Sequence, residues 1–94
     1  MVLEIAVFTV TPGHADAFAE AYGQARAQLT ESPGCRSTRM TRGVEDPDRF
    51  VLMVEWDTLE AHTEGFRGSE RFTQWRALIG PHFDSADVQH VTDL

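Results

Sequence analysis

The chain has 94 residues, of which 41% are hydrophobic and 24% charged, and this composition excludes an intrinsically disordered protein. Its formal net charge of −7, without any basic cluster, argues against a nucleic-acid partner, because nucleic-acid affinity depends on neutralising phosphates. No apolar run approaches the roughly 18 residues of a membrane span, and the N-terminus lacks the features of a signal peptide, so we expect one cytoplasmic domain, residues 1–94, with no membrane contact.

The first third of the chain predicts a strand followed by an amphipathic helix. Val2 to Val10 is apolar at nearly every position and rich in β-branched and aromatic residues, with Glu4 and Thr9 as polar interruptions. From His14 to about Glu31, apolar residues recur with helical spacing at Phe18, Tyr22, Ala25 and Leu29. The proline and glycine of residues 32–34 (SPG) should end this helix, which we expect to pack on one face of a sheet.

Two strands should follow as an antiparallel hairpin, Cys35 to Val44 and Arg49 to Trp56, joined by a turn at residues 45–48 (EDPD). The second of these strands is apolar at successive positions from Val51 to Val54, as in a strand buried on both faces. The helices of so short a chain can cover only one face of its sheet. We therefore expect a homodimer in which a second copy covers the other face.

A short helix should begin near Thr58, because Asp57 opens a capping-box pattern (DTLE). Gly65 and Gly68 should break this helix. A second helical segment should start at the Ser69 cap, and residues 70–79 continue it to about Ile79.

Residues 86–92 (ADVQHVT) predict a short last strand, which completes the order strand, helix, strand, strand, helix, strand. This order is typical of a ferredoxin-like α+β fold (βαββαβ), with both helices on one face of a four-stranded antiparallel sheet. Two such sheets packed face to face would enclose a partly hollow apolar interior.

Several segments resemble a known family. Residues 50–57 (FVLMVEWD), residues 61–62 (AH) and the later Phe66, Ser69, Phe72 and Trp75 are similar to the antibiotic biosynthesis monooxygenase (ABM) domain of the dimeric α+β barrel superfamily. Residues 7–14 (VFTVTPGH) and the break at residues 32–34 fit the same family, so the resemblance covers essentially the whole chain. The resembled family includes cofactor-free oxygenases, haem-degrading enzymes and an isomerase, so the resemblance indicates fold more specifically than activity.

The resemblance implies a cofactor-independent monooxygenase that acts on a small phenolic, quinol or anthrone-like substrate. In that chemistry the substrate loses a proton, its anion reduces dioxygen directly, and a peroxide intermediate collapses to a quinone and water. The protein must supply an apolar pocket, a base and hydrogen-bond donors for the developing oxyanion. Two alternatives stay open: a non-oxidative lyase, cyclase or isomerase on the same fold, and a non-catalytic ligand-binding dimeric module.

His62 is the first candidate for the base. It lies on the inward stripe of its helix between Leu59 and Phe66, and histidine titrates near neutral pH. Many members of the resembled family carry a histidine here. The alternative is a packing histidine that bonds a backbone carbonyl or an acid such as Glu55.

Arg39 is the second catalytic candidate, because an inward-facing arginine in the middle of its strand would stabilise an oxyanion. The polar alternation of that strand does not decide which residues face inward. For substrate binding we expect His90 on the last strand and Tyr22, whose hydroxyl could reach the pocket from the first helix. Structural use of Tyr22 is the alternative.

Four further aromatic residues are candidates for contacts with the substrate. Trp56 and Trp75 could present indole N–H groups or stacking faces, and Phe66 and Phe72 could form a cavity wall. Core packing is the alternative for both tryptophans, because each lies on an apolar stripe.

The sequence also excludes several kinds of chemistry. No HxH or HxxxH spacing occurs, and Cys35 is the single cysteine, so we expect no metal site. Without lysine there is no side-chain Schiff base. Haem degradation fits poorly, because family members with that activity use an asparagine, which is absent here, and this chain has Phe66 and Trp75-Arg76 near the expected tryptophan and histidine positions.

Overall fold

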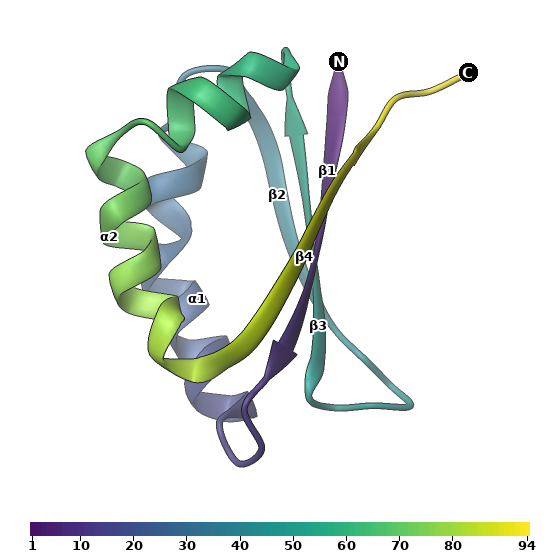
Figure 1. Ribbon diagram of the computed structural model, residues 1–94, viewed down its shortest axis with the longest axis vertical. Helices are drawn as coiled ribbons and strands as arrows, with labels where there is room; N and C mark the ends of the chain where they lie inside the picture. The colour runs from purple at the N-terminus through teal and green to yellow at the C-terminus, as the bar shows by residue number, and fades with distance from the viewer.

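Four antiparallel strands form one sheet, and two helices pack on one of its faces (Figure 1). This computed structural model describes all 94 residues. Its elements are β1 (Val2–Val10), α1 (Ala15–Thr30), β2 (Cys35–Arg42), β3 (Arg49–Trp56), the π-helical turn η1 (Ala61–Phe66), α2 (Glu70–Ile79), the 3₁₀ turn η2 (Gly80–His82) and β4 (Phe83–Val91). The strand order is β2-β3-β1-β4, which confirms the predicted ferredoxin-like α+β fold. None of the helices is long and apolar enough to cross a membrane.

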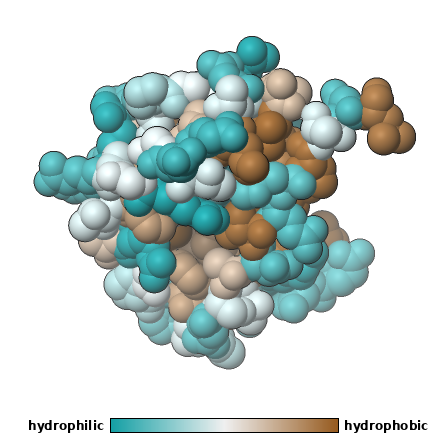
Figure 2. Space-filling view, turned by 45° about the horizontal axis from the view of Figure 1, so that its top comes forward, coloured by the Kyte–Doolittle hydropathy of each residue, from teal (hydrophilic) through white to brown (hydrophobic).

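The two faces of the sheet differ in burial. Towards the helices, β1 and β3 present residues that are at most 5% exposed: Glu4, Ala6, Phe8, Val10, Phe50, Leu52, Val54 and Trp56. The opposite face carries apolar residues that are half-buried, among them Leu3, Ile5, Val7, Val51 and Met53. Within one chain β3 is therefore buried on one face, whereas its sequence predicted burial on both. Figure 2 shows hydrophobic residues gathered on the sheet side and a mostly hydrophilic helix side.

The helix-facing core is built around Phe18 of α1, which is fully buried. Its ring centroid lies 5.3 Å from that of Phe8 and 4.8 Å from that of Phe50, in the inclined arrangements that aromatic pairs prefer. Burying side chains of this size stabilises the fold by about 1.5–3 kcal/mol each. The predicted stripe of α1 is confirmed, with Ala25 and Leu29 also buried.

The segment between β3 and η1 differs from the prediction. The Asp57 carboxylate pairs with Arg36 of β2 instead of capping a helix. The cap comes from the next residue, because the hydroxyl of Thr58 accepts a hydrogen bond from the Ala61 backbone N–H at 3.1 Å. The turn that follows is π-helical rather than α-helical, which changes the spacing of the side chains that it presents.

Gly34 fixes the position of η1 against the sheet. Its φ of +86° favours glycine, and a Cβ atom there would lie 2.8 Å from the Cβ of Ala61. Its carbonyl accepts a hydrogen bond from the Asp57 N–H at 2.8 Å. The close approach of this turn to Ala61 places the adjacent His62 over the edge of the core.

Two strand boundaries also differ. The second strand ends at Arg42, before the predicted Val44, whose side chain is exposed. The last strand begins at Phe83 rather than at residue 86, because it pairs with β1 as far as the Val10–Phe83 partners.

Candidate active site

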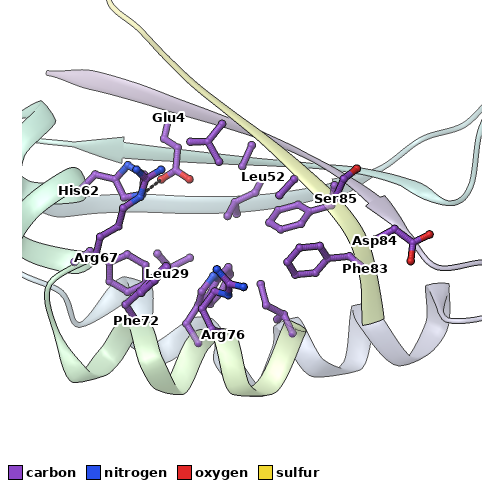
Figure 3. A pocket seen from close by; sticks show the side chains of 17 residues that line it. Glu4, Leu29, Leu52, His62, Arg67, Phe72, Arg76, Phe83, Asp84 and Ser85 are labelled. Carbon is purple, nitrogen blue, oxygen red and sulfur yellow. Dashed lines mark ion pairs between the residues drawn. The ribbon is translucent and has the colours of Figure 1, made fainter. Parts of the chain in front are cut away.

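A cavity of about 390 Å³ lies between the inner face of the sheet and the helical segments η1 and α2 (Figure 3). Its volume falls in the range of small-molecule sites. Of its 17 lining residues 11 are hydrophobic. The lining comes from β1 and β3 (Glu4, Ala6, Phe8, Leu52), from α1 (Leu29), from the helical segments (His62, Phe66, Arg67, Phe72, Trp75, Arg76, Ile79) and from β4 (Phe83, Asp84, Ser85, Ala86, Val88).

Three aromatic residues on the helical side form one wall of the cavity. The ring of Phe66 stands edge-to-face with that of Phe72, with centroids 5.5 Å apart, and its centroid is 6.4 Å from that of Trp75. Phe66 and Trp75 are almost fully buried. The wall is therefore rigid and offers flat apolar surface to a planar ligand.

A buried acid–base cluster occupies the end of the cavity beneath η1. Glu4 and His90 are direct neighbours across β1 and β4, so both side chains point to the helix side. His62 reaches them from η1, with its Nδ1 atom 2.7 Å from Nε2 of His90 and its Nε2 atom 3.4 Å from Oε1 of Glu4. The same carboxylate oxygen accepts a hydrogen bond from Trp56 Nε1–H at 2.9 Å.

The cluster is held by packing as well as by polar contacts. The His62 ring lies nearly parallel to the indole of Trp56, with ring centroids 5.2 Å apart and planes 17° apart. Trp56 is fully buried, and His62 and Glu4 are 3% and 5% exposed. The positions of all three side chains are therefore fixed.

Burial shifts the pKa values of this cluster in opposite directions. It raises the pKa of Glu4, and the Trp56 hydrogen bond and the Arg67 charge oppose that rise. Burial, followed by the charges of Arg67 and His90, lowers the pKa of His62 to about 4. Burial and then Arg67 also lower the pKa of His90. Both histidines are consequently neutral at pH 7.

Two proton arrangements satisfy the neutral histidine pair. In the first, His90 donates its Nε2 proton to His62, and Nε2–H of His62 points at an ionised Glu4. In the second, His62 donates its Nδ1 proton to His90, and Glu4 is protonated and faces the free lone pair on Nε2. When the first arrangement changes into the second, Glu4 receives one proton from His62, and His90 takes up one proton from outside the cluster. The cluster therefore has the connectivity of a proton relay.

Two arginines add positive charge to the cavity. Arg67 extends from the end of η1 towards Glu4 and His62, and Arg76 points into the cavity from α2 (Figure 3). Neither guanidinium takes part in an ion pair. The Arg76 guanidinium lies over the ring of Phe72, 5.8 Å from its centroid. Neither arginine has an acidic partner that a negatively charged ligand would have to displace.

Five of the eight residues proposed from the sequence meet at this site. His62, Phe66, Phe72 and Trp75 line the cavity, and His90 contacts His62.

The other three lie elsewhere. Arg39 lies beside Met53 on the outer face of the sheet, because Thr38 and Met40 take the inner positions of β2. The Tyr22 hydroxyl is 3.1 Å from the Thr38 hydroxyl and does not line the cavity. Trp56 is a core residue that acts on the site through Glu4.

Sequence reasoning missed Glu4 and both cavity arginines. Glu4 was visible as the acidic interruption of an apolar strand, in phase with the core residues Ala6 and Phe8. Arg67 follows His62 by five residues, and the π-helical turn brings it to the same end of the cavity. A search for acids in phase with a buried stripe would have found Glu4.

The profile of the antibiotic biosynthesis monooxygenase family matches residues 1–78. An uncharacterised protein of Bacillus subtilis (strain 168), YczJ, is 34% identical over 95 residues, with all of both chains covered.

Solved structures show the same fold. A protein from Bordetella bronchiseptica, provisionally assigned as an antibiotic biosynthesis monooxygenase, superposes with a TM-score of 0.95 at 34% identity, covering 99% of this chain and 96% of its own. A protein from Nitrosomonas europaea with the same provisional assignment has a TM-score of 0.84 at 21% identity, covering 100% and 99%.

Proposed function

Because this chain belongs to the antibiotic biosynthesis monooxygenase family, we propose that it is a cofactor-independent monooxygenase that oxidises a small phenolic, quinol or anthrone-like substrate with dioxygen. The observation that carries this proposal is the cavity itself. One end holds a buried acid–base cluster, one wall is aromatic, and two arginines without ion pairs supply positive charge. These are the groups that the chemistry requires.

The aromatic wall favours a planar substrate. In the proposed complex a ring stacks against Phe66, Phe72 and Trp75 and directs its polar substituents towards the acid–base cluster. The polar lining residues outside the cluster are Arg76, Asp84 and Ser85. Arg67 and Arg76 lower the cost of forming a phenolate or enolate in that position, because nearby positive charge stabilises the anion. Binding and activation of the substrate would thus use the same groups.

The reaction balances with dioxygen as the sole oxidant. The acid–base cluster removes a proton from the substrate, and the electron pair left on carbon forms a bond to dioxygen, giving a peroxide anion. Return of the proton gives a hydroperoxide. Loss of the second hydrogen from that carbon as a proton then breaks the O–O bond, so that a CH₂ group and O₂ become a carbonyl group and water.

The homodimer belongs to the same proposal. The outer face of the sheet carries half-buried apolar residues on β1 and β3, including Ile5, Val51 and Met53. A second copy that covers this face would remove the patch from water, as the hydrophobic effect favours. Sedimentation of the native chain and of Met53→Glu tests this: we expect a dimer for the native chain and dissociation of the variant, and a monomeric native chain contradicts it.

Oxygen consumption tests the proposed activity. Purified protein treated with chelator is mixed with a panel of quinols, naphthols and anthrones, and the initial rates are compared with those of heat-denatured protein. We expect at least one substrate to consume oxygen well above the spontaneous rate. Turnover that proceeds equally without dioxygen would indicate the lyase, cyclase or isomerase instead, and no oxygen uptake across the panel would refute the proposal.

A further inference from the structure

One carboxylate oxygen of Glu4 has no partner within the protein. Oε1 accepts the hydrogen bond from Trp56 and faces His62, whereas Oε2 makes no hydrogen bond. The structure contains no buried polar side-chain atom without a partner, so Oε2 is not sealed in the core. Because Glu4 lines the cavity, this oxygen is open to it (Figure 3).

His62 is less available to a substrate than its place in the cavity lining suggests. Its Nδ1 atom is engaged by His90, its Nε2 atom faces Glu4, and its ring face is covered by Trp56. A substrate could reach Nε2 only by sharing it with the carboxylate. The ring is therefore well placed to orient Glu4 and poorly placed to act directly.

We propose that Glu4 is the catalytic residue that takes the substrate proton through Oε2, and that His62 and His90 are positioning residues that hold the carboxylate and exchange protons with it. The proton moves from substrate carbon or oxygen to Oε2 of Glu4, and it returns from there to the peroxide. This inference rests on the proposed function, because it assigns the base for that reaction.

The electrostatics agree with this assignment of roles. A general base works best when its pKa lies near the working pH, and burial moves the pKa of Glu4 upwards from that of a free carboxyl. The pKa of His62 moves to about 4, away from neutrality, which makes its ring a weak base. Arg67 is the charged group that shifts the pKa of Glu4, and His62 and His90 are the titratable side chains beside its carboxylate. The charge of Glu4 in turn helps to raise the pKa of Cys35, after burial.

The variants Glu4→Gln and His62→Gln separate the two roles. Glutamine keeps an oxygen that can accept the Trp56 hydrogen bond, but it cannot take a proton, so the protein should fold and lose activity. We expect Glu4→Gln to lower kcat/KM about 1,000-fold and to abolish the acidic limb of the pH profile of kcat/KM. His62→Gln should lose less activity and should shift this acidic limb to another pH. Native activity in Glu4→Gln, with the acidic limb unchanged, would overturn the assignment.

A second measurement keeps this inference testable if no substrate turns over. The Glu4 carboxyl resonance is identified in ¹³C-glutamate-labelled protein by its loss in Glu4→Gln, and 4-nitrophenol is then added as the probe. We expect the probe to move this resonance and its titration midpoint, because the phenol hydroxyl binds Oε2. If the Glu4 resonance does not move, whether the probe binds elsewhere or does not bind, the role of Glu4 is overturned. The absence of oxygen uptake refutes the proposed function instead.

Discussion

Two histidine pairs in this chain look alike and sit in different surroundings. His62 and His90 approach to 2.7 Å, and His14 and His82 approach to 3.2 Å, in both cases between ring nitrogens of residues far apart in sequence. The first pair adjoins a buried carboxylate and the cavity. The second is half-buried where α1 begins and η2 ends, near the exposed bond between the Thr11 hydroxyl and Asp84.

The difference shows that a histidine contact alone does not make a site. Desolvation and the Arg67 charge shift the pKa values of His62 and His90, and the neighbouring carboxylate gives their protons a destination. The His14–His82 contact joins two segments, and neither ring forms an ion pair with a carboxylate. We therefore expect changes in the first pair to affect chemistry, and changes in the second to affect local stability at most.

Within the comparison of the two pairs, the largest effect is expected when one histidine of each pair is replaced. His62→Ala should lower the rate of oxygen consumption about 100-fold, because Glu4 loses the ring that orients it and exchanges its proton. His14→Ala is the matched control and should change the rate less than twofold. Equal losses in the two variants would show that the surroundings of the pairs do not matter.

Acid should destabilise the protein through His62. The pKa of His62 is about 4 in the folded protein and near 6.5 in the unfolded chain. Between these two pH values the unfolded chain binds more protons than the folded protein. The free energy of unfolding therefore falls as the pH drops from about 6.5 towards 4. The raised pKa of Glu4 acts in the opposite direction, since it favours the folded state as the carboxyl becomes protonated.

Urea unfolding of the native chain and of His62→Gln at several pH values isolates the histidine contribution. Between pH 7 and pH 4.5, we expect the unfolding free energy of the native chain to fall by roughly 2 kcal/mol more than that of His62→Gln. The same comparison with His14→Gln should give parallel curves. A native chain whose stability follows that of His62→Gln across this range would contradict the buried neutral histidine.

The link between the core and the cluster can be broken at Trp56. Trp56→Phe keeps an aromatic ring against His62 and removes the N–H that bonds Glu4, so the buried carboxylate loses its donor. We expect a loss of about 1–2 kcal/mol in unfolding free energy and a further rise in the pKa of Glu4. Carboxyl ¹³C titration measures the pKa of Glu4. An unchanged titration midpoint would show that the Trp56–Glu4 hydrogen bond contributes little to this pKa.

The smallest expected effect is that of His82→Gln, in the second pair. The side chain is half-buried and its contact is a single hydrogen bond, so unfolding free energy should change by less than about 1 kcal/mol and oxygen consumption should stay native. Differential scanning calorimetry and oxygen uptake measure both quantities. A large loss of activity here would show that the second pair also contributes to the chemistry, which this account excludes.

The fold was predictable because its signals are local and periodic. The first strand, Val2 to Val10, matches its predicted bounds, and the stripe of Phe18, Ala25 and Leu29 gave the buried face of α1. Ser69 caps α2 as expected, with its hydroxyl accepting from Phe72 N–H at 3.4 Å. Strand order and helix placement then follow from connection rules.

The site was only partly predictable, because its geometry depends on partners distant in sequence. The sequence offered Glu55 as an acid for His62, but Glu55 lies on the outer face and bonds Ser37, and Glu4 takes that place. The inward phase of β2, which turns Arg39 outwards, depends on a register shift between Cys35 and Ser37. No hydrophobic pattern encodes such a shift.

The fate of the two oxygen atoms tests the central claim most directly. Chelator-treated protein is given an anthrone that it turns over under ¹⁸O₂, and the quinone is analysed by mass spectrometry after a short reaction. The account predicts one ¹⁸O atom in the new carbonyl group of the product and the other in water, with far less product from Glu4→Gln. Product that carries oxygen from water alone, or an equal yield without dioxygen, would contradict it.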